Sequence, residues 1–151
     1  MTGSRYVGSL AALLTSGALV AGCGGSSDNS TTNPLSQSEF VAKASAICET
    51  GGKQIEQAAA KYLGGGRPTP QDFEQFVDKA VVPDTQQQID QFRQLTPPAS
   101  ETDTYATLVD GLQSVTDKLK ANPQLLAQSG DPFAGTKSPA KQLGLDACAK
   151  S

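Results

Sequence analysis

The chain of 151 residues contains no histidine and no tryptophan. Without an imidazole there is no histidine general acid or base, no Ser-His-Asp or Cys-His nucleophile, and no histidine ligand for zinc. We therefore expect no catalytic residues, no metal site and no cofactor. An enzyme would have to use carboxylate, lysine or tyrosine chemistry, which no motif in the sequence indicates.

Basic residues are also few. Twelve Lys and Arg stand against fifteen Asp and Glu, so the formal net charge is −3 and the pI is near 4.8. A nucleic-acid partner calls for a clustered basic face, which this composition does not favour. The same shortage removes any polybasic attraction to anionic lipid.

A long apolar run is missing as well. The longest one, residues 6–20, follows Arg5 and is interrupted by glycine, serine and threonine. A transmembrane helix needs about 20 mainly apolar residues. Residues 1–22 are therefore interpreted as a cleaved export signal rather than a permanent membrane span.

The end of that signal, Val20-Ala21-Gly22-Cys23, resembles the lipobox of bacterial lipoproteins. The resemblance implies a diacylglyceryl group on Cys23, cleavage before it, and fatty acyl chains of the palmitate type in the membrane. Two or more chains, at roughly 0.8 kcal/mol per buried CH₂, anchor a protein stably. The expected location is the extracytoplasmic face of the cell membrane. The alternative is an ordinary cleaved signal with an accidental cysteine nearby.

The residues after Cys23 are polar and rich in glycine, serine and threonine. Because they have no apolar side chain to bury, residues 23–34 are predicted to form a lipidated flexible tether. Residues 35–151 then form the folded domain.

The first predicted helix begins with a capping box, Ser36 and Glu39, and ends at the triple glycine 64–66. Gly51-Gly52 interrupts its pattern, so a kink is expected there. Its apolar residues recur with helical spacing: Phe40, Ala44, Ile47, Cys48, Ile55, Ala58, Ala59, Tyr62 and Leu63.

The second predicted helix opens at Thr69-Pro70 and ends before Pro97-Pro98. Pro83 lies inside its apolar pattern, where a proline removes one hydrogen bond and crowds the preceding turn. We expect a bent, continuous helix here; the alternative is a break at Pro83.

The third predicted helix has Ser100 as its cap and an apolar face from Tyr105 to Leu119. A loop and a short helix from Ser138 follow, and residues 143–145 form a glycine-capped helix end. No segment alternates as a strand would. The sequence thus predicts an all-α fold, a small antiparallel bundle of three long helices plus a short C-terminal helical segment.

Two cysteines remain if Cys23 is lipidated, namely Cys48 and Cys148. Outside the reducing cytosol such a pair is most simply a disulfide. A redox-active or metal-binding pair is the alternative, but the Cys-x-x-Cys spacing and a third ligand are lacking. We expect a disulfide that closes the bundle.

Two side-chain groups could carry a function. Tyr62, Phe76, Phe92 and Tyr105 could line a pocket for an apolar ligand between the helices, or could fill the core. The acidic residues 103, 110 and 117 fall seven apart on the third helix. They form either a divalent-cation strip or a solvated face, and we expect the latter because hard cations need several converging oxygens.

With these features together, the chain resembles small actinobacterial-type lipoproteins of uncharacterised function. Besides the lipobox, the likeness lies in residues 40–48, 95–98 and 143–148. It implies an all-helical, disulfide-closed domain outside the cell membrane and brings no catalytic residues. We expect a non-enzymatic binding or interaction module whose partner is an envelope protein or glycan. The alternative is a carrier of a lipid or other apolar molecule.

Overall fold

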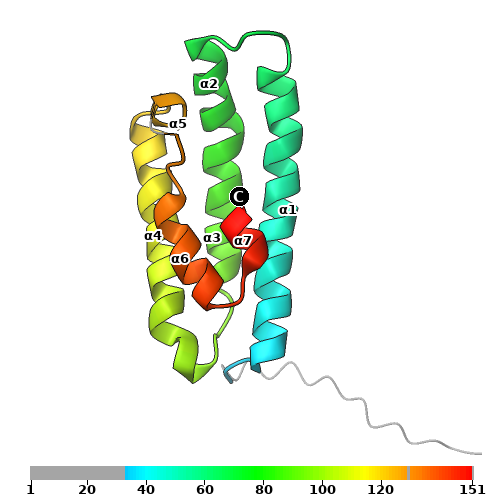
Figure 1. Ribbon diagram of the computed structural model, residues 1–151, viewed down its shortest axis with the longest axis vertical. Coiled ribbons are helices and arrows are strands. Elements are labelled where there is room, and N and C mark those ends of the chain that lie inside the picture. The colour runs from blue at the N-terminus through cyan, green and yellow to red at the C-terminus, as the bar shows by residue number, and fades with distance from the viewer. Residues whose placement is uncertain (1–32, 129, 151) are drawn as a thin grey trace, which may run out of the picture. The chain divides into compact units, whose positions relative to one another are not determined.

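The computed structural model describes residues 33–128 and 130–150. The predicted export signal, the predicted lipidation site Cys23 and most of the predicted tether lie outside these residues. Within them every regular element is a helix and no strand is present (Figure 1). The all-α prediction is confirmed.

Three long helical rods run up, down and up through the described domain (Figure 1). The middle rod packs against both of its neighbours, and the short helices that follow lie across the bundle, with α6 against α4 and α7 against α1. The rods are α1 (Gln37–Leu63), then α2 (Pro70–Phe76) with η1 (Val77–Val81) and α3 (Val82–Phe92), then α4 (Thr102–Ala121). The short elements are η2 (Ala99–Glu101), α5 (Leu125–Gln128), α6 (Ala134–Gln142) and α7 (Asp146–Lys150).

Helix α1 begins where its capping box predicts. The Ser36 side chain accepts the Glu39 N–H at 3.4 Å, and a Glu39 carboxylate oxygen accepts the Ser36 N–H at 3.1 Å. The helix then continues through Gly51 and Gly52 to Leu63. Gly51 is buried, and a Cβ atom there would lie 2.1 Å from Nε2 of Gln88 on α3. Glycine at this position therefore leaves room for the Gln88 amide.

The second rod is continuous past Pro83, as the sequence predicts. It starts with a second capping box, between Thr69 and Asp72. One turn before Pro83 the helix widens to a π turn, in which the Val82 N–H donates to the Val77 carbonyl. Because proline crowds the carbonyl four residues before it, the looser turn accommodates the ring without ending the helix.

The predicted cap of the third helix is wrong in detail. Ser100 lies in the 3₁₀ turn η2, and α4 starts at Thr102 with no side-chain cap. The Thr102 hydroxyl instead donates back to the Ala99 carbonyl at 3.2 Å. A 3₁₀ turn thus joins the second rod to α4. It contains serine and is followed by threonine, which are residue types that also cap helices.

The last segment contains more helix than the sequence predicts. Helix α6 starts at Ala134 rather than Ser138, and Pro139 lies inside it. Pro139 and Ala140 are buried against the bundle, and this burial offsets the missing hydrogen bond. The end of α6 is as predicted: Gly144 has φ +74°, and the Leu145 N–H donates to the Ala140 carbonyl at 2.9 Å, which is a Schellman motif.

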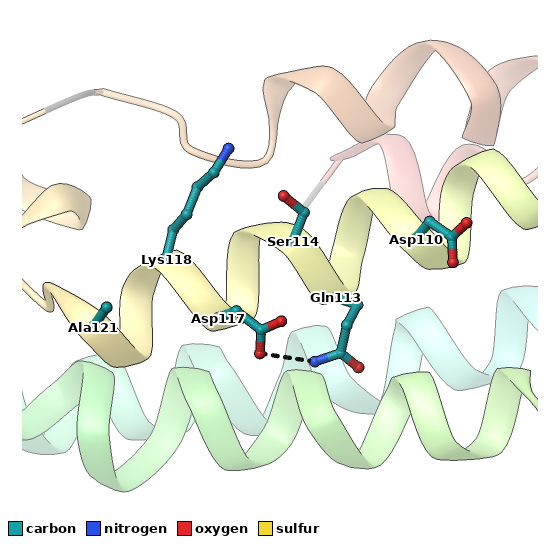
Figure 2. Close-up of a pocket in the computed structure, with 6 residues that line it drawn as sticks. All are labelled: Asp110, Gln113, Ser114, Asp117, Lys118 and Ala121. Atoms are coloured by element: carbon teal, nitrogen blue, oxygen red, sulfur yellow. Dashed lines mark hydrogen bonds between the residues drawn. The ribbon is translucent and has the colours of Figure 1, made fainter.

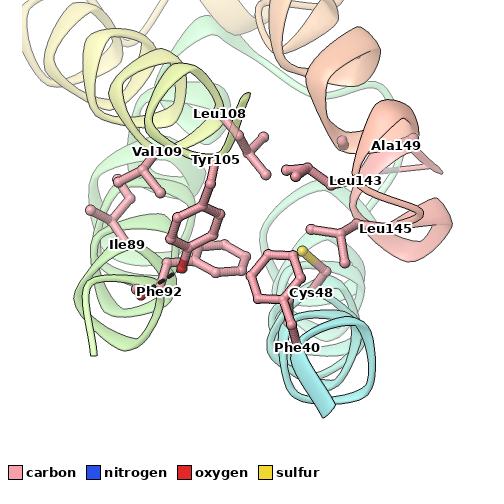
Figure 3. Packing of buried hydrophobic residues seen from close by; sticks show 12 residues of the cluster. Phe40, Cys48, Ile89, Phe92, Tyr105, Leu108, Val109, Leu143, Leu145 and Ala149 are labelled. Carbon is pink, nitrogen blue, oxygen red and sulfur yellow. Dashed lines mark hydrogen bonds between the residues drawn. The ribbon is translucent and has the colours of Figure 1, made fainter. Parts of the chain in front are cut away.

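The buried side chains form two clusters. The first surrounds the edge-to-face rings of Phe40 and Tyr105, whose centroids are 5.2 Å apart (Figure 3). Its fully buried large members are Phe40, Ile89, Phe92, Leu108, Leu143 and Leu145. The second cluster lies around the second rod and the end of α4, and comprises Phe76, Val77, Ala80, Val81 and Leu119.

Candidate ligand-binding cavity

A cavity of about 440 Å³ lies where side chains of the two clusters meet. Its walls come from all three long rods and from the C-terminal segment. They are mainly apolar: Ile55, Phe76, Val81, Leu108, Leu112 and Phe133 all contribute. Three of these side chains, Ile55, Leu112 and Phe133, are only half-buried. Part of their apolar surface is therefore not covered by other residues.

The disulfide forms part of the wall. Cys48 on α1 and Cys148 on α7 are bonded, as the sequence predicts, and both line the cavity. The bond ties the five-residue helix α7 to the middle of α1 across 100 residues of sequence. It therefore holds in place a wall that so short a helix could not maintain by itself.

Two polar side chains of α3, Thr85 and Gln88, also line the cavity. Thr85 is only 4% exposed. Its hydroxyl has no hydrogen bond to any of the residues that the structure describes. Thr85 and Gln88 are three residues apart, a spacing that places side chains side by side on one helix face.

The ionisable groups lie at the rim. Glu56 and Lys150 line the cavity but are exposed residues. Lys137 and Asp131 also line it and form an ion pair of 2.6 Å with each other. The cavity therefore has an apolar body, charges only where solvent reaches them, and three neutral polar side chains: Thr85, Gln88 and Thr136, whose hydroxyl donates to the Phe133 carbonyl.

Of the four aromatic residues predicted for an apolar pocket, only Phe76 lines the cavity. Phe92 and Tyr105 belong to the first cluster, where the Tyr105 hydroxyl donates to the Phe92 carbonyl at 2.6 Å. Burial raises the pKa of Tyr105 far above its usual value of 10.0. Tyr62 is half-buried against the second cluster, with Lys61 Nζ 5.0 Å from its ring centre. Phe76 thus lies at the cavity, and the other three lie where the packing alternative places them.

The acidic face of α4 has a different geometry. Asp110 and Asp117 border a shallow surface depression whose six lining residues all come from α4 (Figure 2). Asp117 accepts a hydrogen bond of 3.0 Å from the Gln113 side chain. Because one helix provides the whole lining, no second element supplies converging oxygens. Within residues 33–128 and 130–150, no group of three His, Cys, Asp or Glu side chains could hold a metal ion.

Sequence reasoning missed the neutral polar residues of the cavity, among them Thr85 and Gln88. A signal for Thr85 was available, because it stands four residues after Val81 and four before Ile89, at a core position of the helical pattern. A polar threonine among the apolar residues of a helix face is a candidate for a functional residue. No comparable signal identified Gln88, because its place in the wall depends on the close approach of Gly51.

In the part of the chain that the structure describes, no helix is long and apolar enough to cross a membrane. Comparison with known protein families found no matching family model. Searches of curated proteins and of solved structures likewise found no match.

Proposed function

We propose that this chain is a lipid-anchored protein of the extracytoplasmic face of the cell membrane that binds a small, mainly apolar molecule. The observation that carries the proposal is the cavity. Its volume of about 440 Å³ falls in the range of roughly 300–1,000 Å³ that is typical of small-molecule sites. Its lining, mainly apolar with few polar groups, is also typical of such sites.

The cavity is more than a packing defect. It opens to solvent at its charged rim, so its apolar walls are left in contact with water instead of being packed against protein. Here Ile55, Leu112 and Phe133 remain half-buried although they belong to the borders of the two clusters. An apolar ligand would remove their remaining surface from water, at roughly 25 cal/mol per Å² buried. A carrier of an apolar molecule is therefore favoured over a module that presents only its surface.

The membrane anchor rests on Val20-Ala21-Gly22-Cys23 and on the disulfide. A disulfide between Cys48 and Cys148 fits an oxidising compartment and so supports export. Intact-mass analysis of the mature protein should give an N-terminal Cys23 that carries acyl chains. The Cys23→Ala variant should leave the membrane fraction. An unmodified mature N-terminus elsewhere in the chain would overturn the anchor.

Ligand binding can be tested independently of the anchor. Native mass spectrometry of protein purified from its own membranes should detect a retained apolar molecule. An environment-sensitive apolar dye should compete for the same site. Leu126→Phe places extra volume on the cavity wall, whereas Leu63→Phe adds the same volume to a half-buried residue outside it. The first variant should abolish dye binding and the second should retain it; equal binding by both would contradict the assignment of the site.

A further inference from the structure

We infer that Thr85 and Gln88 form a hydrogen-bonding end of the cavity, and that the ligand is a neutral, mainly apolar molecule with a hydroxyl or carbonyl oxygen. The inference rests on the proposed function, because it specifies which apolar molecule the same site accepts.

The strongest evidence is the contrast among three buried threonines. Thr116 and Thr136 donate to the carbonyls of Leu112 and Phe133, each at 2.8 Å. Thr85, which is equally buried, donates to no described residue. The hydrogen-bonding capacity of the Thr85 hydroxyl is therefore not used by its own helix, unlike that of the other two, and is left for water or a ligand in the cavity.

The Thr85 hydroxyl remains accessible. Among the described residues no side-chain nitrogen or oxygen is both sealed from solvent and unpaired. Since the Thr85 hydroxyl makes no hydrogen bond to a described residue, its oxygen has some accessible surface, and Thr85 lines the cavity. The hydroxyl is therefore positioned to bond to whatever occupies the cavity.

Gln88 supplies complementary groups. Its amide lies against the buried backbone of Gly51, in space that a Cβ atom would fill, and it also lines the cavity. A carboxamide offers an acceptor and two donors, and a hydroxyl offers one donor and an acceptor. Together they can bond to a ligand hydroxyl or carbonyl in either direction.

The charge distribution favours a neutral ligand. The ionisable groups that line the cavity are Glu56, Asp131, Lys137 and Lys150. Asp131 and Lys137 are paired with each other, and Glu56 and Lys150 are exposed at the rim. An ion placed beside Thr85 would lose its hydration without gaining a buried counter-ion, which proteins strongly disfavour.

The experiment compares three probes of one ring system: naphthalene, 2-naphthol and 2-naphthoate. Each is titrated by fluorescence, at neutral pH, into the purified mature protein and into its Thr85→Val, Gln88→Leu and Thr116→Val variants. Valine matches threonine in shape, so Thr85→Val removes the hydroxyl with little change in volume. Thr116 is as buried as Thr85 but does not line the cavity, so Thr116→Val is the matched control.

We expect the wild-type protein to bind naphthalene and 2-naphthol but to bind 2-naphthoate at least tenfold more weakly than 2-naphthol. Thr85→Val should weaken 2-naphthol roughly three- to tenfold, the range of one hydrogen bond, and leave naphthalene unchanged or tighter. Gln88→Leu should act in the same direction, and Thr116→Val should change the affinity for neither probe.

The outcomes separate this inference from the proposed function. If both neutral probes bind and Thr85→Val and Gln88→Leu affect them equally, the cavity is an apolar site and the polar end is wrong. Tight binding of 2-naphthoate would overturn the requirement for neutrality. If none of the three probes binds, the inference and the assignment of the cavity both fail.

Discussion

Removal of the disulfide should destabilise the domain by several kcal/mol. The Cys48→Ala, Cys148→Ala double variant releases a loop that spans 100 residues of sequence. In the chain-entropy treatment, closing a loop of about 100 residues restricts the unfolded chain by about 4.7 kcal/mol at 25 °C. Single domains have total stabilities of about 5–15 kcal/mol, so the variant should lose a third or more of its stability.

The loss should begin at α7. This helix has five residues, and it contacts the bundle through α1 and α6. A helix of that length does not persist alone in water. Without the bond, the apolar anchors of this segment include Leu145, which is fully buried, Ala149, which is 8% exposed, and the partly buried Ala147. We expect the α7 amides to exchange with solvent much faster in the double variant, while the amides of α1 and α4 stay protected.

Equilibrium denaturation in guanidinium chloride, followed by circular dichroism, gives the free energy of unfolding of both proteins. Wild-type protein treated with a phosphine reductant provides a second route to the same state without mutation. A loss below about 1 kcal/mol by either route would refute the entropic reasoning, because the expected effect is several times larger. If the α7 amides of the double variant stay protected from exchange, the expectation that unfolding begins at α7 is wrong. The double variant should also bind the apolar dye more weakly, since both cysteines line the cavity.

Three further predictions concern other parts of the domain. Gly52→Ala should raise the free energy of unfolding by roughly 0.5–1 kcal/mol in denaturant titration, because a Cβ there meets no atom within 4 Å and alanine favours a helix interior. Tyr105→Phe should lower it by about 1 kcal/mol, since it removes a buried hydrogen bond to the Phe92 carbonyl; an unchanged midpoint would contradict this. Hydrogen bonds from Ser36 and Thr69 hold the pKa values of Glu39 and Asp72 below their ordinary 4.5 and 3.8. The contribution of these two carboxylates to stability should therefore be complete above about pH 5 and decline as pH falls through the lowered pKa values. A Glu39→Gln, Asp72→Asn variant should not show this part of the decline in stability.

The helix ends were predictable because their signals are local. A capping box joins residues three apart, and the Schellman motif at Gly144 joins residues five apart. Such bonds form between near neighbours whatever the rest of the chain does. The continuity of the second rod past Pro83 was predictable for a related reason, because the apolar stripe continues on the far side of the proline.

The start of α6 could not be predicted in the same way. Gly135 and Pro139 are poor helix residues, and local preference favours a loop there. The helix forms because Pro139, Ala140 and Leu143 are buried in the bundle, which is a tertiary effect. The cavity has the same origin, since its walls combine residues of α1 and of the second rod with residues as far along the chain as Lys150.

The cavity and the disulfide belong to one arrangement. Helix α6 packs against α4 and α7 packs against α1, so these two short helices span the face of the bundle in front of α3 (Figure 1). Thr136 and Lys137 of α6 and Cys148 and Lys150 of α7 line the cavity from that side. Short helices cannot hold such a wall by their own stability, and the covalent bond to α1 supplies what they lack. A bundle that needed only to be stable could fill this space with larger side chains. A wall fastened by a disulfide beside this space, with a threonine hydroxyl that bonds to none of the described residues, fits the ligand site that we propose.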